Sequence, residues 1–173
     1  MNRLLLSTVS FFILLWSCAQ SPDPAPVATA DDLPALTPLQ GECDFSTPLV
    51  PGIPGSPGHL IRSPRNPNGD SELSYLMRQM ADDLEAARKA VAAGTRPAPL
   101  LPIHRRIRCS WPTKLDERNA QFDGMAQSYL AAVKTFDETP TQGAYNAIVQ
   151  GCVSCHSVSC RGPLDRIDEL VWR

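Results

Sequence analysis

The sequence predicts an all-α protein, and three observations support this class. After residue 70, apolar side chains recur every three or four residues in several long stretches, which is the spacing of one helix face. No stretch of useful length alternates apolar and polar residues as a half-buried strand does. Eleven of the 17 prolines lie between Pro22 and Pro67, so we expect residues 70–173 to form the helical domain.

Residues 1–17 have the pattern of a secretory signal peptide, in which Arg3 precedes a short apolar run. The run is shorter than the roughly 20 residues that a membrane-spanning helix needs, and an uncleaved anchor is the alternative. The segment Leu15-Trp16-Ser17-Cys18 resembles the lipobox of bacterial lipoproteins. That resemblance implies that Cys18 is acylated and holds the chain on the bilayer of the bacterial cell envelope, facing the periplasm or the exterior.

Residues 18–69 are rich in proline and glycine and predict a linker between the lipid anchor and the domain. Proline lacks an N–H group and glycine loses much chain entropy on folding, so regular structure is not expected there. The part after Cys43 contains more apolar residues, among them Phe45 and Ile61. We expect that part to lie against the domain.

The first predicted helix begins near Asp70 or Ser71, either of which can cap it, and ends at Gly94 with Pro97 beyond. Its apolar stripe comprises Leu73, Leu76, Met77, Met80, Leu84, Ala87 and Val91. A short helix is predicted over residues 100–109, and a longer one over residues 115–137, whose stripe comprises Phe122, Met125, Tyr129, Val133 and Phe136.

Thr139-Pro140-Thr141-Gln142 predicts the start of a further helix, with Thr139 as its cap and Pro140 in its first turn. Its apolar stripe comprises Tyr145, Ile148, Val149, Cys152, Cys155 and His156. Gly162-Pro163 breaks this helix, and a last amphipathic turn or two is expected around Leu164, Ile167, Leu170 and Val171.

Cys152-Val153-Ser154-Cys155-His156 is a C-x-x-C-H sequence, which is typical of the attachment site of a c-type haem. Two thiols three positions apart on a helix can each add to one vinyl group of the same haem. The adjacent imidazole can then serve as the proximal iron ligand. We therefore expect one covalently attached haem c, held by Cys152 and Cys155, with His156 on the iron.

Two other chemistries use a C-x-x-C pair. A redox disulfide of the thioredoxin type requires a βαβ context, which the helical pattern does not provide. A zinc site requires a second pair of ligands, and only His59 and His104 remain among the histidines. Haem is attached to such motifs outside the cytoplasm, so the signal sequence also favours the haem interpretation.

The late position of the motif and the preceding helical stripes resemble the cytochrome c-prime family over roughly residues 70–161. That resemblance implies a four-helix bundle with the haem motif on its last helix. The family typically places an aromatic residue and an arginine after the histidine, whereas here Ser157-Val158 follows and Arg161 comes later. We therefore expect a proximal pocket that is built differently.

Low-spin members of this family bind iron at its sixth position through a methionine of the first helix. Leu76-Met77-Arg78 resembles that position, which makes Met77 the candidate distal ligand. Met80, one turn further on, and His104 are alternatives, as is an open site; both methionines could instead be core residues. The arginines next to His104 indicate either an exposed surface or partners for the haem propionates: Arg105, Arg106 and Arg108.

Three further cysteines, Cys43, Cys109 and Cys160, are expected to form one pair and leave one thiol in an oxidising compartment. The sequence does not choose among the three pairings. A bond from Cys109 to Cys160 would tie the middle segment to the haem helix, and one from Cys43 to Cys160 would hold the linker on the domain.

These features predict a membrane-tethered monohaem cytochrome that passes single electrons between redox proteins of the envelope. The alternative is a module that binds or senses nitric oxide or carbon monoxide at an open distal site, and a third is a haem-bearing subunit of a larger oxidoreductase. No arrangement of acid, base and nucleophile predicts an independent enzyme. The formal net charge of −2 gives no electrostatic basis for binding nucleic acid.

Overall fold

The computed structural model describes residue 41, residues 43–63 and residues 65–173. The predicted signal peptide, the predicted lipid attachment at Cys18 and the first part of the predicted linker lie outside the described residues.

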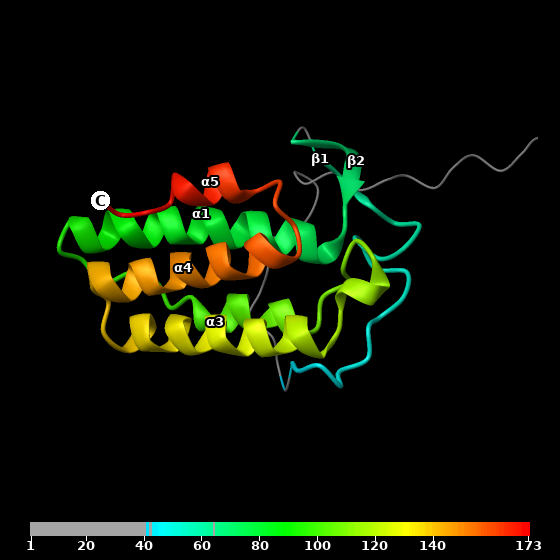
Figure 1. The fold of residues 1–173 in the computed structure, drawn as a ribbon, viewed down its shortest axis with the longest axis horizontal. Helices are drawn as coiled ribbons and strands as arrows, with labels where there is room; N and C mark the ends of the chain where they lie inside the picture. Colours follow the sequence, from blue (N-terminus) through cyan, green and yellow to red (C-terminus); the bar gives the residue numbers. More distant parts are fainter. Residues whose placement is uncertain (1–40, 42, 64) are drawn as a thin grey trace, which may run out of the picture.

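Three long helices account for most of the regular secondary structure in the described residues, which confirms the predicted helical class. They are α1 (Glu72–Ala92), α3 (Ala120–Glu138) and α4 (Gln142–Val158). The helices α3 and α4 are antiparallel neighbours with the most extensive contact in the molecule, and α4 also contacts α1 (Figure 1). The end of α4 that carries the C-x-x-C-H motif lies near the start of α1, as Figure 1 shows.

Each long helix begins at a side-chain cap that satisfies an otherwise unpaired N–H group. Ser71 accepts from the amide of Ser74 at 3.1 Å, and Asn119 accepts from that of Phe122 at 3.0 Å. Ser71 is thus the cap of α1. The cap of α4 is Thr141, so the prediction of Thr139 was wrong: Thr139 closes the C-terminus of α3, where its amide donates to the carbonyl of Thr135.

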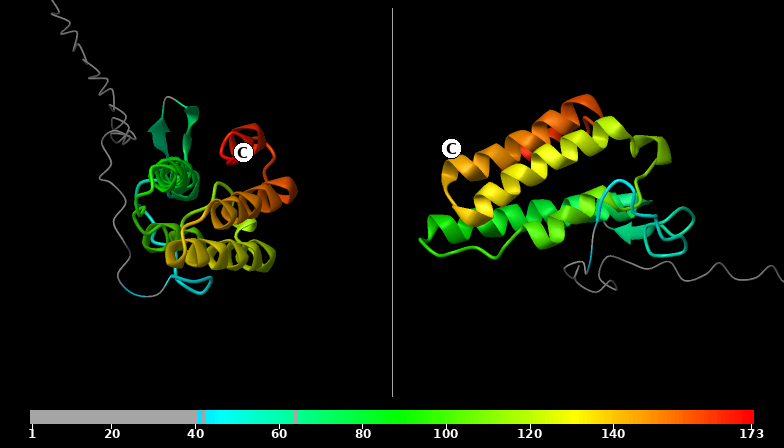
Figure 2. Two further views of the ribbon diagram at one scale, coloured as in Figure 1. Left: turned by 90° about the vertical axis from the view of Figure 1, so that its left-hand side faces the viewer. Right: turned by 90° about the horizontal axis from the view of Figure 1, so that it is seen from below.

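Short helical segments complete the domain. After α1, α2 (Leu101–His104) runs into the 3-10 helix η1 (Arg105–Arg108), and both pack against α1 and α3. A second 3-10 helix, η2 (Leu115–Glu117), precedes α3. The last helix, α5 (Leu164–Asp168), follows the break at Gly162-Pro163 and packs on α4 (Figure 2).

The core lies between the long helices. Its most fully enclosed side chains come from α3 and α4, and the hydroxyl of Tyr145 donates to the carbonyl of Leu170 at 2.9 Å, which holds the C-terminal segment on the helices. The residues with no solvent exposure there are Val133, Phe136, Tyr145, Ile148 and Val149.

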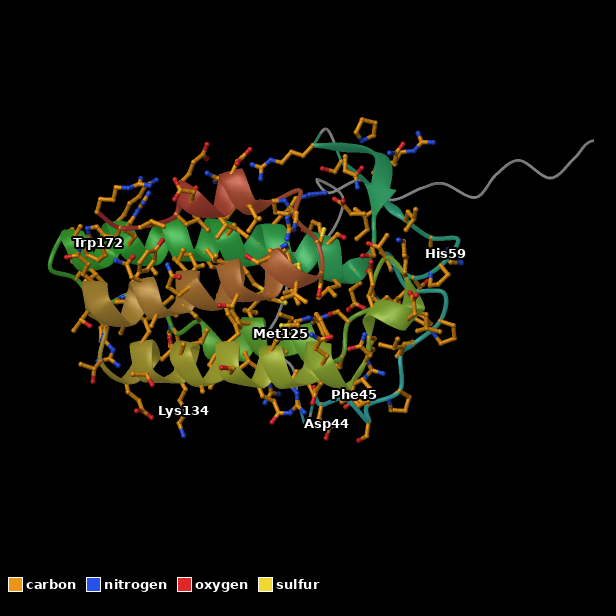
Figure 3. All side chains as sticks on the ribbon, viewed as in Figure 1. Asp44, Phe45, His59, Met125, Lys134 and Trp172 are labelled. Atoms are coloured by element: carbon orange, nitrogen blue, oxygen red, sulfur yellow. A yellow bond between two sulfur atoms is a disulfide. The ribbon has the colours of Figure 1, made fainter. Side chains whose placement is uncertain are left out.

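The described part of the predicted linker lies on the helical domain rather than apart from it, as its apolar residues suggested. Trp111 donates its indole N–H to the carbonyl of Val50 at 2.5 Å. Arg118 donates to the carbonyl of Thr47 at 3.0 Å and lies over the ring of Phe45, 5.1 Å from its centre. Figure 3 shows Phe45 beside the start of α3.

A two-stranded antiparallel hairpin precedes α1, although the sequence predicted no strands. It consists of β1 (Ile61–Ser63) and β2 (Asn66–Asp70), with Ile61 opposite Asp70. Strands this short carry too few residues to show an alternating pattern. Their pairing depends on Gly69, whose φ of +87° is a left-handed conformation that glycine adopts without strain.

A disulfide joins Cys43 to Cys109 and ties the N-terminal segment to the end of η1. This is the third of the pairings that the sequence allowed. Within the described residues, the exposed Cys160 and the partly buried motif cysteines Cys152 and Cys155 form no disulfide.

Candidate functional site

A cavity of about 1000 Å³ opens among the helices at the end of α4. This volume is at the upper end of the roughly 300–1,000 Å³ that is usual for bound small molecules. Side chains from α1, α3, α4 and the α5 segment line it, and most of its wall is apolar. The apolar wall includes Leu73, Leu84, Ile107, Phe122, Ala126 and Ile167.

The three chemically distinctive residues of the motif all line this cavity: Cys152, Cys155 and His156. They fall within α4, which continues without interruption to Val158. On a helix, residues three and four positions apart share a face, so Cys152 lies on the same face as both Cys155 and His156. The structure therefore brings the predicted attachment residues together in one place.

The imidazole of His156 is oriented by the chain just beyond α4. Its Nδ1 lies 2.8 Å from the carbonyl oxygen of Cys160. A carbonyl can only accept, so Nδ1 carries the proton and Nε2 keeps a lone pair for a ligand. A backbone carbonyl on the second ring nitrogen is the arrangement that commonly orients a metal-binding histidine.

Both motif thiols are protonated at neutral pH in the absence of a bound group. Burial raises the pKa of Cys152 to about 12, and the neighbouring Cys155 adds to the shift. Burial also raises the pKa of Cys155, with a further contribution from Cys160. Cys160 lines the same cavity as a third thiol.

Three methionines also line the cavity: Met77 and Met80 from α1, and Met125 from α3. Met80 is 5% exposed, whereas Met77 and Met125 are half-buried. Figure 3 shows Met125 on the α3 side of the molecule. Sequence reasoning assigned Met125 to the core stripe of α3, and only the packing of α3 beside α4 reveals its place on the cavity.

His104, the third predicted candidate for the iron, is not among the residues that line the cavity. It is fully buried, and its Nδ1 lies 2.8 Å from the hydroxyl of Tyr129. Its Nε2 lies 3.4 Å from Oδ2 of Asp83 and makes no hydrogen bond with the described residues. Tyr129 lines the cavity and stands between it and His104.

Gly151 allows α3 and α4 to approach closely at the cavity. A Cβ atom at this position would lie 3.3 Å from Cδ2 of Tyr129, tighter than an ordinary contact. Sequence reasoning did not identify this glycine, because only the neighbouring helix makes its small size necessary.

The arginines that follow His104 in the sequence, which we considered as partners for the haem propionates, do not line the cavity. Arg106 pairs with Glu72 at 3.3 Å and Arg108 with Asp123 at 2.8 Å, away from the cavity lining. The cavity is instead lined by three arginines from the hairpin, α1 and α5: Arg65, Arg78 and Arg166.

Two further findings concern metals and membranes. Among the described residues, no three His, Cys, Asp or Glu side chains are grouped so that they could hold a metal ion by themselves. No helix within the same residues is both long enough and apolar enough to cross a bilayer.

Comparisons of the chain with profiles of protein families, with curated proteins and with solved structures find no match.

Proposed function

We propose that this protein is a membrane-tethered monohaem c-type cytochrome that carries single electrons in the bacterial envelope. One observation carries the proposal: Cys152, Cys155 and His156 lie on one face of α4 and line one large, mostly apolar cavity. The donor set and the space fit a haem, whereas the described side chains form no closed metal site.

The residues of α4 would hold the haem covalently and orient it. Each thiol of Cys152 and Cys155 would hold the haem through a thioether, since its S–H bond can add across a vinyl double bond and no group has to leave. His156 would bind the iron through Nε2, because the Cys160 carbonyl holds its other nitrogen. The haem supplies one-electron iron chemistry when bound.

The apolar wall has two roles in such a protein. It excludes water from the cofactor, which affects the reduction potential. It also offers soft thioether sulfurs for the sixth iron position. Met77 is our candidate, and it lines the cavity together with Met80 and Met125. His104 and an open site remain alternatives, although the position of His104 behind Tyr129 favours a methionine.

The order of the helices supports a cytochrome c-prime-like four-helix bundle. In that arrangement α1, α3 and α4 supply three of the helices, and α2 with η1 takes the second place in the chain as a much shortened helix. The motif is then on the fourth helix, as the resemblance implies. The α5 segment is an addition that packs on α4.

The Cys43–Cys109 disulfide supports an oxidising compartment, where such bonds form and persist. An oxidising compartment agrees with export of the chain and with attachment of haem outside the cytoplasm. Acylation of Cys18 would hold the protein on the bilayer, where its partners are other redox proteins of the envelope. Neither catalysis of its own nor nucleic-acid binding is part of this proposal.

The attachment is tested by replacing both motif cysteines, as Cys152→Ala with Cys155→Ala, and staining for haem after denaturing electrophoresis. We expect the unaltered protein to stain and the double variant to lose the stain completely. Cys160→Ala is the matched control, because this third thiol lines the same cavity but lies outside the motif. An unstained wild-type protein, expressed together with a haem-attachment system, would refute the proposal.

The distal ligand is tested by optical spectra of Met77→Ala, Met80→Ala and Met125→Ala. We expect Met77→Ala alone to convert a low-spin haem to a five-coordinate one, to lower the reduction potential and to admit carbon monoxide. A high-spin spectrum in the unaltered protein would show an open site and replace the electron carrier with the gas-binding alternative.

A further inference from the structure

Arg78 is held at the cavity by a buried partner from the hairpin. The carboxylate of Asp70 is fully buried, and Nε of Arg78 donates to its Oδ2 at 3.1 Å. The Nη2 group of Arg78 donates to the other carboxylate oxygen, Oδ1. Asn66 also donates to Oδ1, at 2.8 Å. The guanidinium therefore has a defined direction, and Nη1, which makes no hydrogen bond with the described residues, is left to face a second acceptor.

Arg65 reaches the same cavity from the hairpin itself, between β1 and β2. Its side chain is 64% exposed, and its Nη1 lies 3.9 Å from Oδ1 of Asp82, which is too far for a hydrogen bond. Such an exposed pair contributes little to stability. Arg65 can therefore turn to a stronger anionic partner at little cost.

Arg166, the third arginine at the cavity, is already committed. One of its terminal nitrogens donates to Glu85 and the other to Glu169, the latter at 2.7 Å. Two carboxylates neutralise this guanidinium. On the η2 side the cavity is lined by Asp116 and Glu117, which would repel an anionic ligand. The side formed by the hairpin and the start of α1 is thus the part of the rim that offers guanidinium N–H donors: Arg78 through Nη1, and Arg65 through its weakly paired side chain.

We propose that Arg78 and Arg65 bind the propionate carboxylates of the haem, and that the β1–β2 hairpin exists to hold these two arginines at the cavity. Guanidinium groups bind carboxylates through directed, charge-assisted hydrogen bonds. This inference rests on the proposed function, since it names the residues that recognise the acidic part of the same cofactor. It assigns a role to a segment that the sequence places in a linker.

The hairpin is built in a way that suits this role. Gly69 precedes Asp70 with a left-handed backbone, and a Cβ atom there would lie 2.8 Å from Cβ of Leu60. The strand pairing places Asp70 opposite Ile61, which is 2% exposed and anchors β1 in the molecule. Asp70 is therefore positioned by the hairpin, and Arg78 is positioned by Asp70.

The test uses the full-length holoprotein after haem staining has confirmed attachment. Arg65→Gln removes one exposed cation. Arg78→Gln combined with Asp70→Asn removes the second guanidinium together with its buried partner, so that no buried carboxylate is left unpaired. The matched control is Arg62→Gln, an exposed hairpin arginine that does not line the cavity. The readouts are the reduction potential and the propionate bending bands of the resonance Raman spectrum, which respond to hydrogen bonding at the carboxylates.

We expect both test variants to shift the propionate bands relative to Arg62→Gln. Arg65→Gln should also lower the reduction potential, because removal of a cation near the iron favours the ferric state. The double variant at Arg78 and Asp70 removes one cation together with one anion, so its potential should change much less. Arg78→Lys should shift the bands while keeping most of the potential, because it retains the charge but loses the fork of donors.

Propionate bands that match those of Arg62→Gln in both test variants would overturn the inference while leaving the proposed function intact. A wild-type protein without covalent haem would instead refute the proposed function itself. The two failures are therefore distinguishable.

Discussion

His156 and His104 occupy two contrasting regions of the molecule. His156 lies on the cavity side, where one ring nitrogen is bound to a backbone carbonyl and the other is available to a ligand. His104 lies on the α2 side, fully buried, with its two nitrogens facing Tyr129 and Asp83. The residue type is the same, but one imidazole is prepared to bind and the other is enclosed by the protein.

The difference separates a histidine that stabilises the fold from a histidine that can bind a ligand. An enclosed imidazole whose neighbours are protein groups helps to specify the packing around it, and its loss leaves other polar atoms unsatisfied. An imidazole at a cavity with one nitrogen oriented by the backbone has few stabilising contacts to lose. Changes on the cavity side should therefore alter the spectrum, and changes on the α2 side should alter stability.

The largest expected effect is that of His156→Ala. In the proposed cytochrome, the thioether bonds should keep the haem on the chain while the iron loses its proximal ligand, so we expect the optical spectrum to change completely. The control is His59→Ala, because His59 is exposed in the N-terminal segment, far from α4 in Figure 3. A variant that keeps the wild-type spectrum would show that another residue serves as the proximal ligand.

The second effect concerns the disulfide between Cys43 and Cys109. Replacing Cys43 and Cys109 with alanine removes a crosslink between residues 66 positions apart. We expect a loss of about 4 kcal/mol in the free energy of unfolding, measured by denaturant titration, with the haem spectrum unchanged. Cys160→Ala, which removes an unpaired cysteine, should have little effect. Equal stability of all three proteins would mean that the disulfide does not form.

The third effect sharpens the comparison directly. His104→Ala leaves a void in the core and removes the partner of the Tyr129 hydroxyl, so we expect a loss of about 3 kcal/mol in stability. Tyr129→Phe, which removes only the hydroxyl, should cost about 1 kcal/mol. Both variants should keep the wild-type optical spectrum. A five-coordinate spectrum in folded His104→Ala would identify His104 as the distal ligand after all.

The smallest effect is a dependence of stability on pH. Burial raises the pKa of Asp83, but interactions with His104 and Gln79 outweigh it, and the net pKa lies below the usual value of 3.8. A depressed pKa contributes stability above the unfolded-state value, and this contribution is lost as the pH falls through the folded-state pKa. Asp83→Asn should therefore lose less stability on acidification below about pH 4 than the wild type, by under about 1 kcal/mol.

The matched control for this measurement is Asp82→Asn, because Asp82 is adjacent and exposed but has no contact with His104. Other carboxylates with lowered pKa, Asp44 and Asp123, contribute to the same acid range in every variant. The prediction therefore concerns the difference between the two asparagine variants, and identical acid profiles would contradict it.

Local features of the sequence determined the helices and the common face of the motif. Capping residues such as Ser71, the apolar stripes and the break at Gly162-Pro163 act within a few residues of chain, so their consequences can be derived without tertiary contacts. The same holds for Cys152, Cys155 and His156, because helical geometry alone places them together.

Only the tertiary structure decided which distant residues meet. The pairing of Cys43 with Cys109, the enclosure of His104 by Tyr129 and Asp83, and the place of Met125 on the cavity all join segments far apart in the chain. The hairpin that holds Arg78 was also revealed only by the tertiary structure, since its strands are too short to show an alternating pattern in the sequence. Such contacts depend on how whole helices pack against one another, and a spacing of apolar residues specifies which face is buried but not which neighbour covers it.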